Sequence, residues 1–86
     1  MLVLIPSALH SYTGGRGEIE ASGATIDELL RGLDRRCPGL RFRIVDEQDQ
    51  IRPHIRITVN AEIVSALAAA LSPEDKVAII MAFSGG

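Results

Sequence analysis

The segment from Thr25 to Gly39, "TIDELLRGLDRRCPG", constrains the fold of this 86-residue chain more than any other stretch. Thr25 and Glu28 stand three residues apart, which is the spacing of a capping box at the start of a helix. Apolar side chains then recur at helical spacing on a single face: Ile26, Leu29, Leu30, Leu33 and Cys37. Pro38 and Gly39 end the helix. The sequence therefore predicts one amphipathic helix, which must bury its apolar face against another part of the chain.

Short strand-like segments lie on both sides of this helix. They are apolar runs or stretches in which polar and apolar side chains alternate, and strands are expected at residues 2–5, 17–22, 54–60, 62–64 and 76–83. The glycine-rich residues 12–17 suit a hairpin turn between the first two strands. A single helix can cover only one face of such a sheet, so the sequence predicts an α+β fold.

The remaining segments and the order of the elements complete this prediction. Residues 40–53 are expected to be irregular and polar, with four residues covering one edge of the core: Leu40, Phe42, Ile44 and Val45. Residues 65–72, "SALAAALS", favour a helix of about two turns. Long connections allow the first and last strands to pair in parallel, as in the β-grasp fold. We therefore expect a β-grasp domain over residues 1–82, with a mixed sheet of four to five strands and one main helix packed on one face, and a flexible Gly-Gly tail at residues 83–86.

The composition argues against several classes of function. The net charge of −2 gives no basic surface of the kind that binds nucleic acid or an anionic membrane. Three aromatic residues, Tyr12, Phe42 and Phe83, are too few for a base-stacking platform. The single cysteine, Cys37, excludes an intrachain disulfide, and residues 1–10 are too short an apolar run for a signal peptide or a membrane span. We therefore expect a cytoplasmic protein with no nucleic-acid or membrane partner.

No group of residues inside the predicted domain forms the pattern of an active site. The glycine loop at residues 13–17 lacks the P-loop pattern, and no helix begins directly after it. His10 and His54 each lack a second metal ligand at suitable spacing. His54 stands between two arginines, which is typical of a solvated strand edge that could also face a partner. Cys37 is interpreted as a small core residue rather than a nucleophile. No carboxylate stands in an apolar run that would suit acid–base catalysis, so we expect no metal, no bound cofactor and no catalytic group inside the domain.

The sequence ends on Gly85 and Gly86, directly after the predicted last strand. At average glycine usage a terminal pair of glycines arises by chance roughly 0.5% of the time, although termini also carry glycine for no functional reason. Glycine has no side chain, so the residues from Phe83 through Ser84 to Gly86 suit a narrow channel in another protein. Its free φ angle also lets the terminal carboxylate approach a nucleotide from varied directions. The Gly86 carboxylate is therefore the predicted functional group.

Three stretches carry a resemblance to a known family. Residues 52–64, "RPHIRITVNAEIV", form a strand, a turn at Asn60 and a second strand, and residues 72–86, "SPEDKVAIIMAFSGG", form an acidic turn, a last strand and the Gly-Gly end. Residues 5–15, "IPSALHSYTGG", form the first loop. Together they resemble the small sulfur-carrier proteins of the MoaD/ThiS superfamily, which share the ubiquitin-like fold, and the first loop is similar to the branch that includes the cysteine-synthesis carriers. Met81 to Ser84 stand where that family often has proline and valine, a departure that bears on which activating enzyme fits.

The resemblance implies a carrier or co-substrate rather than an enzyme. A ubiquitin-activating-type adenylating enzyme would use ATP and Mg²⁺ to transfer AMP to the Gly86 carboxylate, and a sulfur donor would convert the adenylate to a thiocarboxylate. An acceptor synthase of a biosynthetic pathway would then take the sulfur. Other hypotheses are a ubiquitin-like modifier conjugated to lysine through Gly86, a molybdopterin synthase small subunit, and a β-grasp interaction domain whose tail is incidental.

The predicted last strand has two different faces, because side chains alternate along a strand. One row is bulkier and should enter the core, because it buries more apolar area: Val77, Ile79 and Met81. The other row, Ala78, Ile80 and Ala82, should lie on the open face of the sheet. A shallow apolar patch that leads into the tail suits the docking of an adenylating enzyme, with Phe83 anchoring the chain where it leaves the domain.

Overall fold

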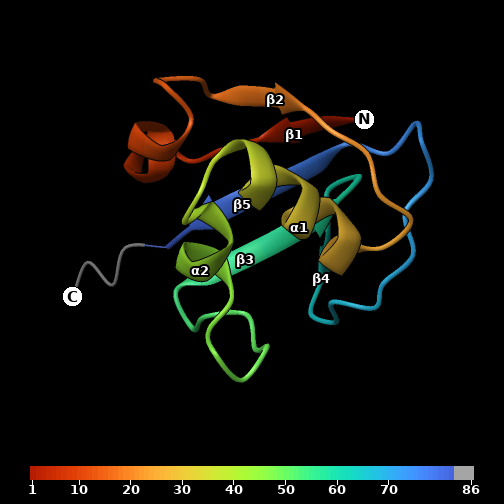
Figure 1. The fold of residues 1–86 in the computed structure, drawn as a ribbon. Helices are drawn as coiled ribbons and strands as arrows, with labels where there is room; N and C mark the ends of the chain where they lie inside the picture. The colour runs from red at the N-terminus through yellow and green to blue at the C-terminus, as the bar shows by residue number, and fades with distance from the viewer. Residues whose placement is uncertain (83–86) are drawn as a thin grey trace.

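The computed structural model describes residues 1–82, and the predicted tail, Phe83 to Gly86, lies outside the described residues. Five strands form one sheet in the order β2-β1-β5-β3-β4 (Figure 1). Their bounds are β1 Leu2–Leu4, β2 Glu18–Glu20, β3 Ile55–Val59, β4 Glu62–Val64 and β5 Val77–Met81. β1 and β5 pair in parallel at the centre of the sheet, and the other neighbouring strands pair antiparallel. The prediction of a mixed β-grasp sheet is confirmed.

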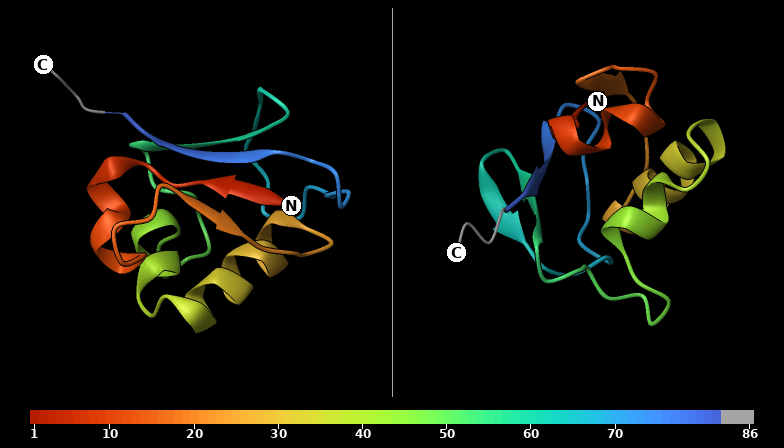
Figure 2. Two further views of the ribbon diagram at one scale, coloured as in Figure 1. Left: turned by 90° about the horizontal axis from the view of Figure 1, so that it is seen from above. Right: turned by 90° about the vertical axis from the view of Figure 1, so that its left-hand side faces the viewer.

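Helices cover only one face of this sheet. The main helix, α1 (Ile26–Arg36), and a short second helix, α2 (Leu40–Ile44), lie on the same side, and no other element of residues 1–82 covers the opposite side (Figure 2). The core fills the space between these helices and the inner face of the sheet, where the fully buried side chains include those of Ile26, Leu30, Ile57 and Val77. No helix within residues 1–82 has the length and apolar character needed to cross a membrane.

The main helix forms where the sequence places it. Thr25 is the N-cap, and its Oγ1 accepts a hydrogen bond of 3.2 Å from the backbone N–H of Glu28. The Glu28 carboxylate accepts from the backbone N–H of Ala24 at 3.5 Å, one residue before the position that a capping box predicts. Cys37 follows the last turn and is 9% exposed, so its predicted place in the core is confirmed.

The connection between β1 and β2 differs from the predicted hairpin turn. Residues Ser7–Tyr12 form a 3-10 helix, η1, before the glycine-rich turn begins. Gly14 and Gly15 both have positive φ angles, and the backbone N–H of Gly15 donates to the carbonyl of His10 at 2.8 Å. The glycines therefore close the end of η1 instead of joining the two strands directly, and the whole loop lies beside the end of β1 (Figure 1).

The expectation of an irregular segment at residues 40–53 is wrong at its start, where α2 forms. Gly39 has a φ of 93°, and the Asp34 carboxylate accepts from the backbone N–H groups of Gly39 and Arg41, at 3.1 Å each. A side chain of α1 thus satisfies the first N–H groups of α2. Three of the four residues expected to cover the core edge are buried, namely Leu40, Ile44 and Val45, whereas Phe42 is 55% exposed.

The predicted helix at residues 65–72 is also wrong. This segment contains turns and one isolated bridge, between Ala70 and Thr25. Its carbonyls accept hydrogen bonds from the first turn of α1: Ile26 N–H donates to Ala69 at 3.1 Å, and Asp27 N–H donates to Leu67 at 2.9 Å. In a helix over residues 65–72 the carbonyl of Leu67 would instead accept from the N–H of Leu71 within the segment. Satisfying the unpaired N–H groups of α1 therefore outweighs the helix propensity of the alanines.

Candidate functional site

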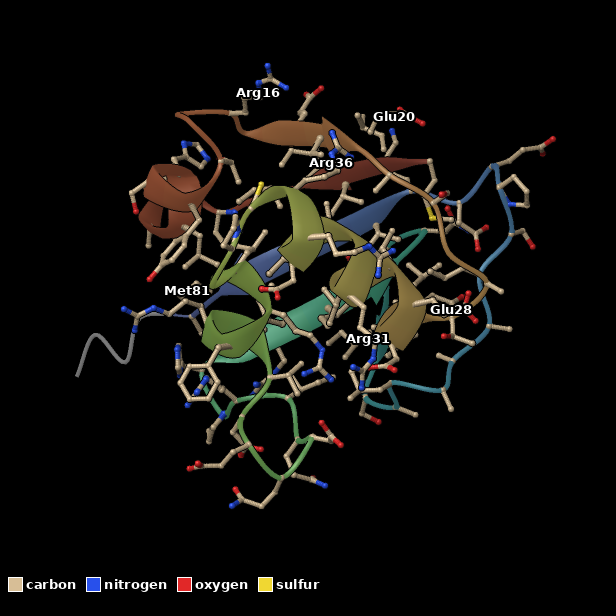
Figure 3. All side chains as sticks on the ribbon, in the orientation of Figure 1. Arg16, Glu20, Glu28, Arg31, Arg36 and Met81 are labelled. Atoms are coloured by element: carbon tan, nitrogen blue, oxygen red, sulfur yellow. The ribbon has the colours of Figure 1, made fainter. Side chains whose placement is uncertain are left out.

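The candidate site lies where β5 ends and the chain continues toward Gly86. The backbone N–H of Ala82 donates to the carbonyl of His54 at 2.8 Å, which fixes the point at which the chain leaves the sheet. Met81, the last residue of β5, lies at the same end of the molecule as α2 and η1 (Figure 3). The predicted site residues Phe83, Ser84, Gly85 and Gly86 lie outside the described residues. The structure therefore describes the site up to Ala82, the residue that precedes the predicted tail.

The side chains of β5 alternate between a buried and an open face, as predicted. Val77 and Ile79 are 1% and 3% exposed and belong to the core, against which Met81 packs, half-buried. Ile80 is 46% exposed, and Ala82 is also exposed. The predicted assignment of the two faces is confirmed, and a role for Ile80, Ala78 and Ala82 in partner binding stays a prediction.

An apolar pocket lies beside Ile80 on the open face. It has a volume of about 460 Å³ and lies between the end of β1 and β5. We call it the apolar pocket; its lining includes Leu4, Pro6, Ala8, Ala78 and Ile80. Pairing in the sheet places Leu4 beside Ala78 and Arg56 opposite Ile80, so a basic side chain borders the apolar surface. This arrangement can accept an apolar side chain of a partner and is not equipped for catalysis.

A second pocket lies at the end of β5 and shares Ala8 and Met81 with the first. Its volume is about 490 Å³, and its polar lining comes from three segments: Ser11 and Tyr12 of η1, Arg43 of α2, and Arg52 and His54 of the segment before β3. We call it the basic pocket. The sequence indicates only His54 among these as a residue that could face a partner. The other members are far apart in sequence, and the helices η1 and α2 that bring them together are not predicted from it.

Other candidate groups are engaged in structural contacts. Of the two histidines, His10 lies 2.9 Å through Nε2 from the carbonyl oxygen of Ile5, inside the first loop. The guanidinium of Arg31 holds the pKa of Asp27 below its usual value, against a smaller opposing effect of burial, and Arg41 adds to the lowering. The backbone N–H of Ser72 and the side chain of Asn60 likewise lower the pKa of Asp75. Such carboxylates stay ionised and suit structural roles. Residues 1–82 contain no cluster of three or more metal-ligating side chains.

Comparisons with known proteins agree on one family. The profile of the ThiS family matches residues 3–86. The sulfur carrier protein CysO of Mycobacterium tuberculosis is 34% identical over 98% of this chain and 96% of its own length. In its crystal structure CysO superposes with a TM-score of 0.90, covering 95% of this chain and 98% of the other.

Two further solved structures differ in how similar they are to this chain. A chain of the BexX/CysO complex of Amycolatopsis orientalis is 34% identical and superposes with a TM-score of 0.92, covering 99% of this chain and 98% of the other. SAMP1 from Haloferax volcanii is 26% identical, with a TM-score of 0.77, covering 99% of this chain and 97% of the other. The similarity is therefore greater to the two CysO structures than to SAMP1, in sequence and in shape.

Proposed function

This chain belongs to the ThiS family and is a sulfur carrier protein, and we propose that it carries the sulfur as a thiocarboxylate on Gly86. The observation that carries this proposal is the full-length similarity to CysO, at 34% identity over 98% of the chain.

The chemistry begins with a carboxylate, whose negative charge resists attack by a nucleophile. In the proposed reaction an oxygen of the Gly86 carboxylate attacks the α-phosphorus of ATP, and pyrophosphate leaves. The product is a mixed anhydride with AMP, in which the carbonyl carbon is open to attack. Sulfide then attacks that carbon, the C–O bond breaks, and AMP leaves with the electron pair. The product is a thiocarboxylate, ionised at neutral pH.

In this proposal ATP and Mg²⁺ are bound by a partner enzyme and not by this chain. The partner is an adenylating enzyme of the ubiquitin-activating type, and a second protein, an acceptor synthase, takes the sulfur. The crystal structure of the BexX/CysO complex, one chain of which is similar to this protein, supports a protein partner for this chain.

The adenylating enzyme docks on the open face of the sheet in this proposal. Ile80 is 46% exposed and borders the apolar pocket, and two residues separate it from the first residue of the tail. An apolar side chain of the enzyme in this pocket would be desolvated close to the tail, which favours binding and aligns Gly86 with the nucleotide. Ala78 and Ala82 keep the surface low, so the partner can approach closely.

Sulfur loading of the purified chain tests the proposal. We would incubate the chain with the adenylating enzyme of the same organism, ATP, Mg²⁺ and sulfide, and follow the intact mass. The expected result is the exchange of one oxygen for one sulfur, located at Gly86 by fragmentation. Conjugates to lysine side chains instead of the thiocarboxylate would identify a modifier and overturn the carrier proposal.

Two variants of the terminus serve as matched controls. In one, Gly86 is deleted, and in the other a single alanine is added after Gly86, so neither chain has its final carboxyl group on Gly86. Both should keep the melting temperature of the unaltered chain and take up no sulfur. If either variant is loaded as well as the unaltered chain, Gly86 is not the carrier group.

A further inference from the structure

The basic pocket holds two arginines whose orientation is fixed by contacts within the fold. Arg43 donates from Nε to the hydroxyl of Tyr12 at 2.5 Å, and its guanidinium carbon lies 5.6 Å from the centre of the Tyr12 ring. Tyr12 in turn packs on Gly39, where an added Cβ would come within 3.2 Å of the ring. The start of α2 therefore positions Tyr12, and Tyr12 positions Arg43.

Arg52 is held in a similar way. Its Nε donates to the carbonyl of Phe42 at 2.7 Å, and its guanidinium carbon lies 4.6 Å from the centre of the Phe42 ring. This contact explains why Phe42 is 55% exposed in a small domain, since its ring is the surface on which Arg52 lies. The exposed aromatic residue thus serves the pocket rather than the core.

Both arginines use Nε for these contacts, which leaves the outer edges of their guanidinium groups available. Within the described part of the chain neither forms a salt bridge, and no Asp or Glu lines the basic pocket. In contrast, Arg31 and Arg41 are paired with Asp27 on the outer side of α1. A guanidinium fork that is held in place and lacks a carboxylate partner is suited to bind an anion.

The position of the pocket determines what can cover it. The carbonyl of His54, a lining residue, accepts from the N–H of Ala82 at 2.8 Å. Gly86 stands four residues after Ala82 in the sequence, and four extended residues span at most about 14 Å. A protein that acts on Gly86 must therefore lie against the end of the domain that carries Arg43 and Arg52.

We propose that the basic pocket receives carboxylate side chains of an acidic segment on the adenylating enzyme that acts on Gly86. The inference rests on the proposed function and adds the chemistry of the partner surface. The two guanidinium groups come from different segments, which suits two carboxylates on an extended stretch of protein. A free phosphate is less suited, since α2, the helix that carries Arg43, already donates the N–H groups of Gly39 and Arg41 at its N-terminus to Asp34.

Charges at such a position mainly raise the rate of association and fix the relative orientation of the partners. The apolar pocket, on the adjoining surface, contributes buried area. The two pockets share Ala8 and Met81, so a partner that fills the apolar pocket also reaches the basic one.

Association kinetics with matched charge reversals test the proposal. Arg43→Glu and Arg16→Glu change the net charge equally, and Arg16 lies in the loop before β2, pointing away from the body of the protein (Figure 3). We expect Arg43→Glu to slow association with the adenylating enzyme by about tenfold or more at low salt, with a smaller effect at high salt. Arg16→Glu should change the rate by less than about threefold. Equal effects of the two variants would show that only net charge matters and would overturn the proposal.

A zero-length cross-link gives an independent, positive readout. The chain contains one lysine, Lys76, which directly precedes β5, at the opposite end of that strand from Met81. Arg43→Lys keeps the positive charge and places a primary amine in the basic pocket. In the complex, a carbodiimide should join Lys at position 43 to an Asp or Glu of the enzyme, and peptide mapping identifies that residue. A complex that forms but is cross-linked only through Lys76 would contradict the proposal.

Further measurements separate this inference from the proposed function. If the unaltered chain and Arg16→Glu are both loaded with sulfur on Gly86, and Arg43→Glu associates with the enzyme as fast as they do, this inference fails and the carrier proposal stands. If the unaltered chain takes up no sulfur at all, the carrier proposal fails instead.

Titration of the isolated chain with inorganic phosphate tests whether the basic pocket binds a phosphate group rather than carboxylates. Phosphate that binds at Arg43 and Arg52 and blocks association would assign the pocket to a phosphate group and overturn the acidic-segment proposal. Arg43→Gln replaces Arg43→Glu if the latter melts earlier than the unaltered chain.

Discussion

Ile79 and Ile80 are neighbours in β5 with the same side chain, yet they lie in opposite environments. Ile79 is 3% exposed and packs in the core beneath the helices, whereas Ile80 is 46% exposed beside the apolar pocket. The helices cover only one face of the sheet, so alternation along a single strand separates residues that hold the fold from residues that can meet a partner. Stability and partner binding should therefore respond to different substitutions in the same strand.

The largest expected effect is on the buried side of this comparison. Ile79→Ala should lower the free energy of unfolding by about 2–5 kcal/mol, because it removes buried methyl groups and leaves a cavity. Ile80→Ala should change it by about 0.5 kcal/mol or less. Urea denaturation followed by circular dichroism measures both. Ile79→Val, with an expected loss of about 0.5–1.5 kcal/mol, keeps the measurement possible if Ile79→Ala does not fold. Equal losses for the two alanine variants would contradict the assignment of the faces.

The second effect concerns the open face. Ile80→Asp should weaken binding to the adenylating enzyme by tenfold or more, about 1.4 kcal/mol, because a charge would be buried at the contact. Ile63→Asp is the matched control, since Ile63 is 68% exposed and lies on the same face, on β4, two strands away from β5. A binding titration compares them, and thermal unfolding should show both variants folded. If Ile63→Asp weakens binding as much as Ile80→Asp, the contact is not centred on the apolar pocket.

The regions that could be predicted from the sequence are those whose structure is decided locally. In α1, the Thr25 cap, the apolar face and the Pro38–Gly39 end all lie within one segment. The sequence therefore predicts both the helix and the face that it buries. The alternation in β5 similarly placed Ile79 inside and Ile80 outside. For α2 the decisive contact comes from Asp34 on another helix, and a helix of five residues is too short to show a period.

Residues 65–72 are the converse case, a predicted helix that does not form. Their alanines favour a helix locally, but their carbonyls accept from Ile26 and Asp27 in the first turn of α1. The basic pocket could not be predicted for a related reason. Its arginines are ordinary surface residues in the sequence, and only the unpredicted helices η1 and α2 bring Tyr12 next to Arg43 and Phe42 next to Arg52. Segments that depend on distant partners thus carry the part of the candidate site that sequence patterns miss.

Cys37 is buried on the helix side of the core, where a substitution should affect stability and not sulfur loading. Cys37→Ala should cost about 1 kcal/mol of stability, because a small buried group is lost, and should leave sulfur loading of Gly86 unchanged. Cys37→Ser should cost more, since it buries a hydroxyl among apolar side chains. Denaturation and intact-mass analysis of loaded protein measure the two effects. A folded Cys37→Ala chain that fails to accept sulfur would make Cys37 a relay for the sulfur atom.

The smallest expected effect lies on the outer side of the helix layer, away from both pockets. Arg31 and Arg41 hold the pKa of Asp27 below its usual value, so the folded state favours the ionised carboxylate. The resulting stabilisation is present above the usual pKa of aspartate, near 4, and is lost as the pH falls through the lower value in the folded state. Asp27→Asn should therefore be less stable than the unaltered chain at pH 7, by less than about 1 kcal/mol, because solvent reaches both the Asp27 and the Arg31 side chain. The difference should shrink as the pH falls below about 4, where the unaltered chain also loses this charge. Denaturation of both chains from pH 7 to well below pH 4 measures it, with Glu47→Gln as the control, because Glu47 is exposed and its side chain makes no hydrogen bond within residues 1–82. A difference that persists in acid would assign the role of Asp27 to packing rather than to charge.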